Sequence, residues 1–128
     1  MEKKFNAVEY ERNVYINVTP HEIRFKDPDT GKEFIVEPSG LLVNARPVER
    51  LIREKNGIKF VTTEFIGDEK GEMEIQEIRK VYPQGIIIGS IITAQAYKGQ
   101  VVALTPTPGY ERVPVAEKRM NPKKFTIF

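Results

Sequence analysis

The chain has 128 residues, 20 basic against 18 acidic side chains, a net charge of +2 and no cysteine. This length suits one domain with a core of its own. The missing cysteines exclude disulfides, thiolate metal sites and thiol nucleophiles, and the single histidine, His21, argues against a zinc site within one chain. Because the net charge is small, we expect no specific nucleic-acid partner and no membrane partner.

No apolar stretch reaches the ~18 residues of a membrane span, and the opening M-E-K-K-F lacks the apolar centre of a signal peptide. We therefore expect a cytoplasmic protein. Absent cysteine, sparse methionine and abundant Lys, Glu and Arg are typical of a thermophile.

Residues 1–13 are polar and mixed in charge, so we expect an N-terminal tail followed by one domain over 14–128. The apolar pattern predicts strands over 14–18, 23–26, 33–36, 41–43 and 58–66, with short edge strands at 113–116 and 125–128. Residues 27–31, D-P-D-T-G, predict the turn that joins the second strand to the third.

Two stretches favour helices. In residues 48–55 the apolar side chains Val48, Leu51 and Ile52 share one helical face. Residues 72–81 are compatible with helix or strand, and the many Glu, Gln, Arg and Lys residues between the apolar ones favour helix.

Residues 85–104 are the only place where apolar residues run long enough to be buried on both sides, and they predict a strand–helix–strand unit. Residues 86–88 are three consecutive isoleucines, which indicates a central strand buried on both faces. Ser90 is a good helix N-cap, residues 91–97 fit a two-turn helix, and residues 101–104 form a second apolar strand. The whole pattern predicts an α+β (mixed α/β) single domain, mostly β-sheet with one or two short helices.

Three motifs resemble those of small phage- and plasmid-associated proteins. N-V-T-P-H-E-I at 17–23 is similar to their N-L-T-P-H-x-I opening, and P-S-G at 38–40 with A-R at 45–46 is similar to their P-S-G-x-x-A-R segment, with two additional residues between its halves. The I-I-I-G-S-I-I-T-A stretch at 86–94 resembles their strand-Ser-helix. The resemblance implies a virus-associated, mobile-element origin and supplies no activity or functional residue.

The candidate ligand-binding residues begin with Ser90. It opens a helix directly after a buried strand, where free N–H groups favour an anion, although a serine that only caps its own helix is the commoner case. The loop that carries Thr105 and Thr107 follows the partner strand. If the two strands are parallel, this loop lies beside Ser90 at the edge where α/β sheets bind ligands, and otherwise it is a rigid surface loop.

His21 is a candidate general base, with Thr19 nearby, or else a structural histidine. Arg46 is a candidate for binding phosphate or carboxylate, or else a surface arginine. Four basic residues near the C-terminus suggest contact with nucleic acid, although a solvated face fits them better: Lys118, Arg119, Lys123 and Lys124.

These observations lead to two hypotheses of different classes. The first is a ligand-binding protein for a small anionic or nucleotide-like molecule, built on Ser90, Thr105, Thr107, His21 and Arg46. The second is a non-enzymatic structural or interaction module, such as a virion or nucleic-acid accessory protein. The residues do not distinguish an enzyme from a binding protein, they indicate no cofactor and no metal, and they are compatible with a homo-oligomer.

Overall fold

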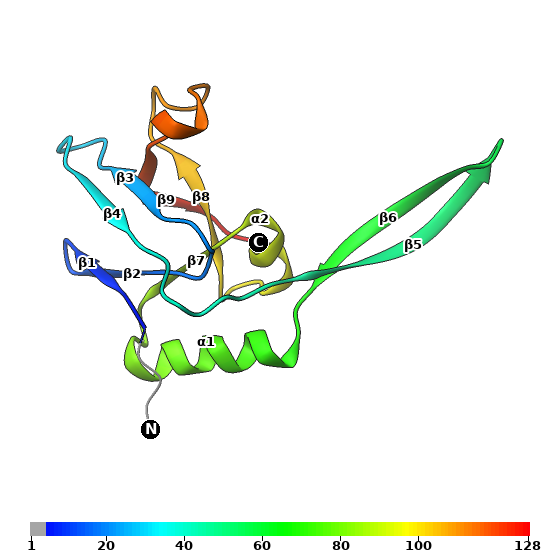
Figure 1. The fold of residues 1–128 in the computed structure, drawn as a ribbon, viewed down its shortest axis with the longest axis horizontal. Coiled ribbons are helices and arrows are strands. Elements are labelled where there is room, and N and C mark those ends of the chain that lie inside the picture. The colour runs from blue at the N-terminus through cyan, green and yellow to red at the C-terminus, as the bar shows by residue number, and fades with distance from the viewer. Residues whose placement is uncertain (1–4) are drawn as a thin grey trace.

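In the computed structural model, which describes residues 5–128, a curved seven-stranded sheet forms the body and a long hairpin projects from it (Figure 1). The order of the strands across the sheet is β1 (Val8–Tyr10), β2 (Asn13–Asn17), β7 (Ile86–Gly89), β8 (Val102–Pro106), β9 (Met120–Thr126), β3 (Ile23–Lys26) and β4 (Glu33–Val36). Strands β2, β7 and β8 are parallel, as are β3 and β9, whereas β1–β2, β8–β9 and β3–β4 are antiparallel. The domain is mostly β with two α-helices, so the expected fold class holds at this coarse level.

The sheet is nearly closed, because the end of β2 returns to the segment after β4. Asn17 forms a parallel bridge with Pro38, and its side-chain amide donates to the Val36 carbonyl at 3.2 Å. Asn17 is completely buried. A buried amide without a hydrogen-bond partner would be costly, so its hydrogen bonds hold the end of β2 to the segment that follows the edge strand β4.

Strand β7 is central and buried on both faces, as its three isoleucines predict. Ile87 packs in one apolar cluster, together with Ile16 and two residues of α1, Ile75 and Ile78. Ile88 packs on the opposite face in a second cluster that contains Tyr15 and Phe25. Consecutive side chains of a strand point to opposite faces, and here each face has its own core.

Both helices follow local signals in the sequence. Helix α1 (Glu69–Val81) begins at Asp68, whose carboxylate accepts from the Gly71 amide at 2.7 Å, and Glu69 stands in its first turn. Helix α2 (Ile91–Ala96) connects β7 to β8, which confirms the predicted strand–helix–strand order. In the part of the chain that the structure describes, neither helix could cross a bilayer.

The hairpin consists of β5 (Arg46–Lys55) and β6 (Ile58–Ile66) joined by Asn56 and Gly57, and we call residues 46–66 the arm. In Figure 1 the arm extends away from the sheet, and only its base lies near α2. The predicted helix over 48–55 is therefore wrong. Leu51 pairs with Val61 and Arg53 with Phe60, so Ile52 is an extra, bulged residue. The bulge breaks the two-residue repeat, and the spacing of Val48, Leu51 and Ile52 then imitates that of a helix.

Four smaller predictions differ from the structure. The short edge strand expected at 125–128 overlaps the end of β9 (Met120–Thr126), which lies between β8 and β3 and is not at an edge. Residues 41–43 are not a strand, although Leu41 and Val43 are buried in the first cluster. The strand expected at 113–116 is replaced by bends and the short 3₁₀ helix η1 (Val115–Glu117), which follows Pro114. In the expected tail, residues 1–4 lie outside the described part of the chain, and Val8–Tyr10 form β1.

Candidate functional site

The motifs at 17–23, 38–40 and 86–94 meet at the carboxyl ends of β2 and β7. Val18 donates its amide to the Ile88 carbonyl, and Ser39 donates its amide to the Asn17 carbonyl. The Asn17 carboxamide oxygen accepts from the amide and the hydroxyl of Thr19, at 2.9 and 2.7 Å. These hydrogen bonds connect the segments that follow β2 and β4 to the end of β7. The three motifs therefore have a structural role.

Ser90 and His21 lie at the same edge of the sheet, because β2 and β7 are parallel neighbours. The Ser90 hydroxyl accepts from the Thr93 amide at 3.1 Å and lies 3.0 Å from the Thr93 hydroxyl, to which it donates, so it caps α2. The His21 carbonyl accepts from the Asn17 side-chain amide at 2.6 Å, and the His21 side chain is exposed. Helix α2 has six residues, and its start is occupied by its own cap.

The other three candidates point elsewhere. Strands β7 and β8 are parallel, as the Ser90 hypothesis requires, but the Thr105 hydroxyl turns toward β9 on the other side of β8 and donates to the Lys124 carbonyl at 2.7 Å. Thr107 is buried and donates to the Lys26 carbonyl at 2.6 Å. Arg46 begins the arm. The five predicted residues therefore do not converge on a common point.

Two of the four basic residues near the C-terminus, Arg119 and Lys123, form ion pairs within the body. Lys118 donates to the Glu111 carbonyl, and Lys124 is exposed. Arg119 bonds Glu33, and Lys123 lies 3.0–3.3 Å from the carboxylates of Glu11, Asp27 and Asp29. A hydrogen bond from the Tyr10 hydroxyl, aided by Lys123, holds the pKa of the buried Asp27 carboxyl well below its usual range. These ion pairs connect Arg119 and β9 to the start of β4, to the turn at 27–31 and to Glu11 in the turn between β1 and β2.

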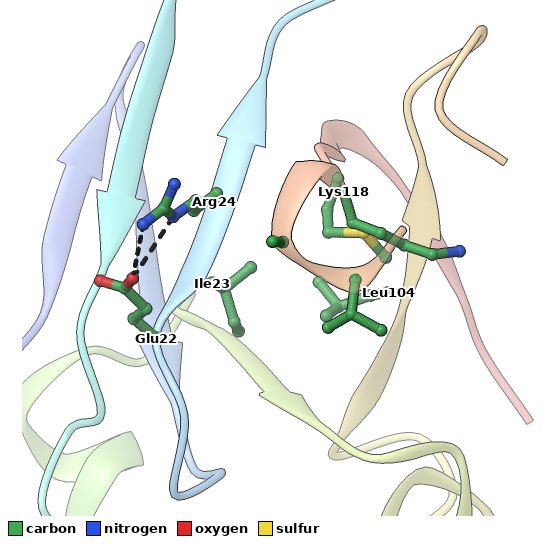
Figure 2. A pocket seen from close by; sticks show the side chains of 8 residues that line it. Glu22, Ile23, Arg24, Leu104 and Lys118 are labelled. Atoms are coloured by element: carbon green, nitrogen blue, oxygen red, sulfur yellow. Dashed lines mark hydrogen bonds and ion pairs between the residues drawn. The ribbon is translucent and has the colours of Figure 1, made fainter. Parts of the chain in front are cut away.

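A groove of about 450 Å³ opens between β3 and β8 (Figure 2). Its wall is largely apolar, with Ile23 from β3 and Leu104 from β8, and η1 contributes Val115. Figure 2 shows the Glu22–Arg24 ion pair, 3.2 Å long, at one side and Lys118 at the other. None of the five predicted residues lines it, although Glu22 and Leu104 are sequence neighbours of His21 and Thr105.

The arm is the most exposed part of the described chain. Every residue from 46 to 64 is exposed, including six large apolar ones that are each at least 41% accessible: Val48, Leu51, Ile52, Ile58, Phe60 and Val61. Buried apolar area is the main force that folds a domain, so side chains of this kind left in solvent indicate a surface that another molecule covers.

The register of the arm sorts its side chains onto two faces, because residues directly opposite in an antiparallel pair share a face. One face, which we call the basic face, carries Arg46, Val48, Arg50, Arg53, Lys55, Ile58, Phe60, Thr62, Glu64 and Ile66. The other, which we call the mixed face, carries Pro47, Glu49, Leu51, Glu54, Lys59, Val61, Thr63 and Phe65. Four cations against one carboxylate give the basic face a net charge of +3, and the mixed face has a net charge of −1.

The bulge at Ile52 produces this separation of charge. In an unbroken strand Arg50 and Glu54 would share a face, and Arg53 and Lys55 would lie on the other. The extra residue moves Arg53 and Lys55 onto the face of Arg50 and sends Glu54 to the opposite one. The Arg53 guanidinium lies 4.8 Å from the centroid of the Phe60 ring, as expected for residues on one face. Among residues 5–128, none of the four cations of the basic face forms an ion pair.

The buried Tyr97 fixes the base of the arm. Its hydroxyl accepts from the Asp68 amide at 2.9 Å, just after the arm, and lies 3.3 Å from the Asn44 carbonyl, just before it. The Thr93 hydroxyl donates to the Val43 carbonyl at 3.3 Å. Burial raises the pKa of Tyr97, so the hydroxyl keeps its proton at neutral pH. The strand–helix–strand unit thus holds both ends of the arm.

The apolar pattern of the sequence predicts β6 but not the arm as a unit. The signal that reveals it is Asn56-Gly57 between two apolar runs, because this dipeptide favours the two-residue turn of a hairpin. Both residues have positive φ angles, 53° and 78°, as such a turn requires.

Comparison of the chain with models of known families, with curated proteins and with solved structures found no match. Within the described residues, no cluster of three or more His, Asp or Glu side chains is placed to hold a metal ion. The candidate functional site therefore rests on the geometry of the chain, and the arm is its strongest element.

Proposed function

We propose that the protein is a non-enzymatic nucleic-acid accessory module, which uses the basic face of the arm to bind the phosphate backbone of a duplex without sequence specificity. The observation that carries the proposal is the row of four unpaired cations, Arg46, Arg50, Arg53 and Lys55, on one face of a projecting ribbon. Basic side chains bind nucleic acid by neutralising phosphates and releasing counterions. The net charge of the whole chain is only +2, because the mixed face and the body supply most of the carboxylates that balance these cations.

The shape of the arm supports the same partner. A two-stranded β-ribbon fits the major groove of a duplex, which is about 12 Å wide. Because the arm extends away from the sheet, the body does not obstruct the approach of a long rod (Figure 1). Contacts of arginine and lysine to phosphate carry no sequence information, so four such contacts predict binding without sequence specificity. With four contacts, we expect a Kd of about 10⁻⁴ to 10⁻⁶ M near physiological salt, which is the non-specific range.

The test is fluorescence anisotropy with a labelled duplex at several salt concentrations. The logarithm of the binding constant should fall with the logarithm of the salt concentration with a slope of about −3.6 when all four cations contact phosphate. Replacing Arg46, Arg50, Arg53 and Lys55 together by Gln should abolish binding. The matched control replaces four exposed lysines of the body by Gln and so removes the same charge: Lys32, Lys70, Lys98 and Lys124.

Binding that survives the four replacements in the arm, or that the control variant loses equally, would overturn the proposal. A duplex and a single strand of equal length are compared in the same assay. A clear preference for the single strand would indicate that unpaired bases pack on Ile58 and Phe60, and that the arm does not bind in the major groove of a duplex.

The groove between β3 and β8 favours a second candidate function, which is the binding of a small anion with an apolar tail. Its volume lies in the usual range of ligand sites, and Arg24 and Lys118 stand beside an apolar wall formed by Ile23 and Leu104. In a thermal-shift series of alkyl carboxylates, the stabilisation should grow with chain length and disappear in Leu104→Lys. Absence of a shift at every chain length would exclude this candidate.

A further inference from the structure

We infer that two copies of this chain associate through the mixed faces of their arms. This inference goes beyond the proposed function, and it stands whether or not the arm binds nucleic acid. The starting observation is that the arm has apolar side chains on both faces, whereas only the basic face fits a polyanion. Leu51 and Val61 form a directly opposite pair at the middle of the mixed face, 54% and 41% exposed.

The mixed face consists of four cross-strand pairs. From the base to the tip they are Pro47 with Phe65, Glu49 with Thr63, Leu51 with Val61, and Glu54 with Lys59. Two of the four pairs are apolar and a third joins opposite charges. Each of these three pairs can contact the same pair in a second copy of the arm. The net charge of +3 disfavours contact between two basic faces, and a basic face against a mixed face is a heterologous contact that does not close into a twofold dimer, so the closed dimer uses the mixed face of both copies.

The charges select one symmetric arrangement. A twofold axis that runs along the arm places each residue of β5 over the residue of β6 to which it is paired, but in the other copy. Glu54 then faces the partner's Lys59, and Leu51 faces the partner's Val61. A twofold axis across the arm at the Leu51–Val61 pair would instead place Glu49 over the partner's Glu54. That contact is repulsive, so the arms point in the same direction.

The predicted dimer is weak. Four residue pairs span about 27 Å along the arm and about 10 Å across it, so each arm buries about 300 Å². A standard interface buries about 800 Å² on each partner. We therefore expect a Kd of about 10⁻⁵ to 10⁻³ M, and in the dimer the two basic faces point outward on opposite sides.

The first experiment exploits the absence of cysteine from the chain, which makes any introduced thiol unique. Thr63 and Thr62 are neighbours of the same residue type on opposite faces of the arm, and both are exposed. With a short bis-maleimide, Thr63→Cys should give covalent dimers at a rate that falls on dilution, whereas Thr62→Cys should not. Equal rates for the two variants, or no cross-linking of Thr63→Cys at about 1 mM, would overturn the inference.

The second experiment separates contacts between arms from contacts within one arm, because Glu54 and Lys59 are also paired in the same hairpin. Glu54→Lys alone and Lys59→Glu alone should each raise the Kd of the dimer, measured by sedimentation equilibrium, about tenfold. An equimolar mixture of the two variants should recover the wild-type constant, because each arm then meets the opposite charge only in its partner. Both sites are exposed, and the melting temperature of each variant checks that the body is folded. A mixture that associates no better than the separate variants would show that these residues do not meet across the twofold axis and would overturn the inference.

Discussion

The body and the arm use similar residues for opposite purposes. In the body, the aromatic side chains contact one another, with ring centroids 5.4 Å apart for Tyr15 and Phe25 and 5.1 Å apart for Phe25 and Phe34. In the arm, the one ring interaction that the structure records among residues 46–64 joins Phe60 to the Arg53 guanidinium. Apolar residues thus secure the fold in the body, whereas in the arm they remain available to a partner.

The two regions also differ in what determines their conformation. The strands of the body are fixed by two apolar clusters, one on each face of β7. The arm has no core, and a two-stranded hairpin is marginally stable in water by itself. Its turn, its cross-strand pairs and its anchor at Tyr97 hold it in place. This difference predicts that substitutions of one kind will have very unequal effects in the two regions.

The largest effect is expected from a charge in the core of the body. Ile87 is 1% exposed, and Ile87→Asp buries a carboxylate without a partner, which costs several kcal/mol of a total stability of about 5–15 kcal/mol. We expect no soluble, folded protein. The matched substitution in the arm, Val61→Asp, should leave the melting temperature of the dilute protein within about 2 °C of the wild type. A soluble Ile87→Asp protein with an unchanged melting temperature would contradict the central place of β7.

A smaller loss is expected where the arm joins the body. A Cβ atom on Gly71 would overlap the hydroxyl and ring of Tyr97, the residue that anchors the arm. Alanine usually stabilises a helix interior by about 1 kcal/mol relative to glycine. Here Gly71→Ala should destabilise the protein by about 1–3 kcal/mol, because Tyr97 must move. Urea unfolding measures the effect, with Gln76→Ala on the exposed face of α1 as the neutral control.

Much of the body could be predicted from the sequence, because its signals are local and agree with burial. The isoleucines at 86–88, the serine cap after them and the D-P-D-T-G turn each specify one conformation, and the structure has a strand, a helix and a hairpin at these places. The near closure of the sheet was not predictable, because it depends on Asn17 and Pro38, which are 21 residues apart and carry no pairing signal.

The site could not be predicted, for two physical reasons. The hydroxyls of Ser90, Thr105 and Thr107 are each engaged by a neighbouring backbone or side-chain group, and only the fold decides which one. In the arm, the face of a residue after a bulge depends on the register with β6, and a single inserted residue reverses it. A net charge of +2 for the chain is therefore no guide to the charge of one face.

A further prediction concerns the buried carboxylate of Asp27, which contacts Tyr10 and Lys123. The hydrogen bond from Tyr10 and the nearby Lys123 lower the pKa of Asp27 in the folded protein. The ionised carboxylate therefore stabilises the fold at every pH above its unfolded pKa of about 3.9. This stabilisation is lost as the pH falls from the unfolded pKa through the lower folded pKa. Asp27→Asn should cost about 1–2 kcal/mol at pH 7, and the difference from the wild type should shrink below about pH 4. Urea unfolding at several pH values measures it. A difference that is independent of pH would show that the charge of Asp27 contributes nothing.

The smallest effect on stability is expected from removal of the arm. Replacing residues 47–65 by Asn-Gly keeps the Arg46–Ile66 pair and closes it with the turn that the tip already uses. The contacts of Tyr97 with Asn44 and Asp68 lie outside the deletion, so the base stays anchored. Because all the deleted residues are exposed except the half-buried Phe65, we expect the free energy of unfolding to change by only about 1 kcal/mol, while duplex binding and self-association are both lost. A shortened protein that unfolds would show that the arm belongs to the folding unit, and one that still binds a duplex would move the binding surface to the body.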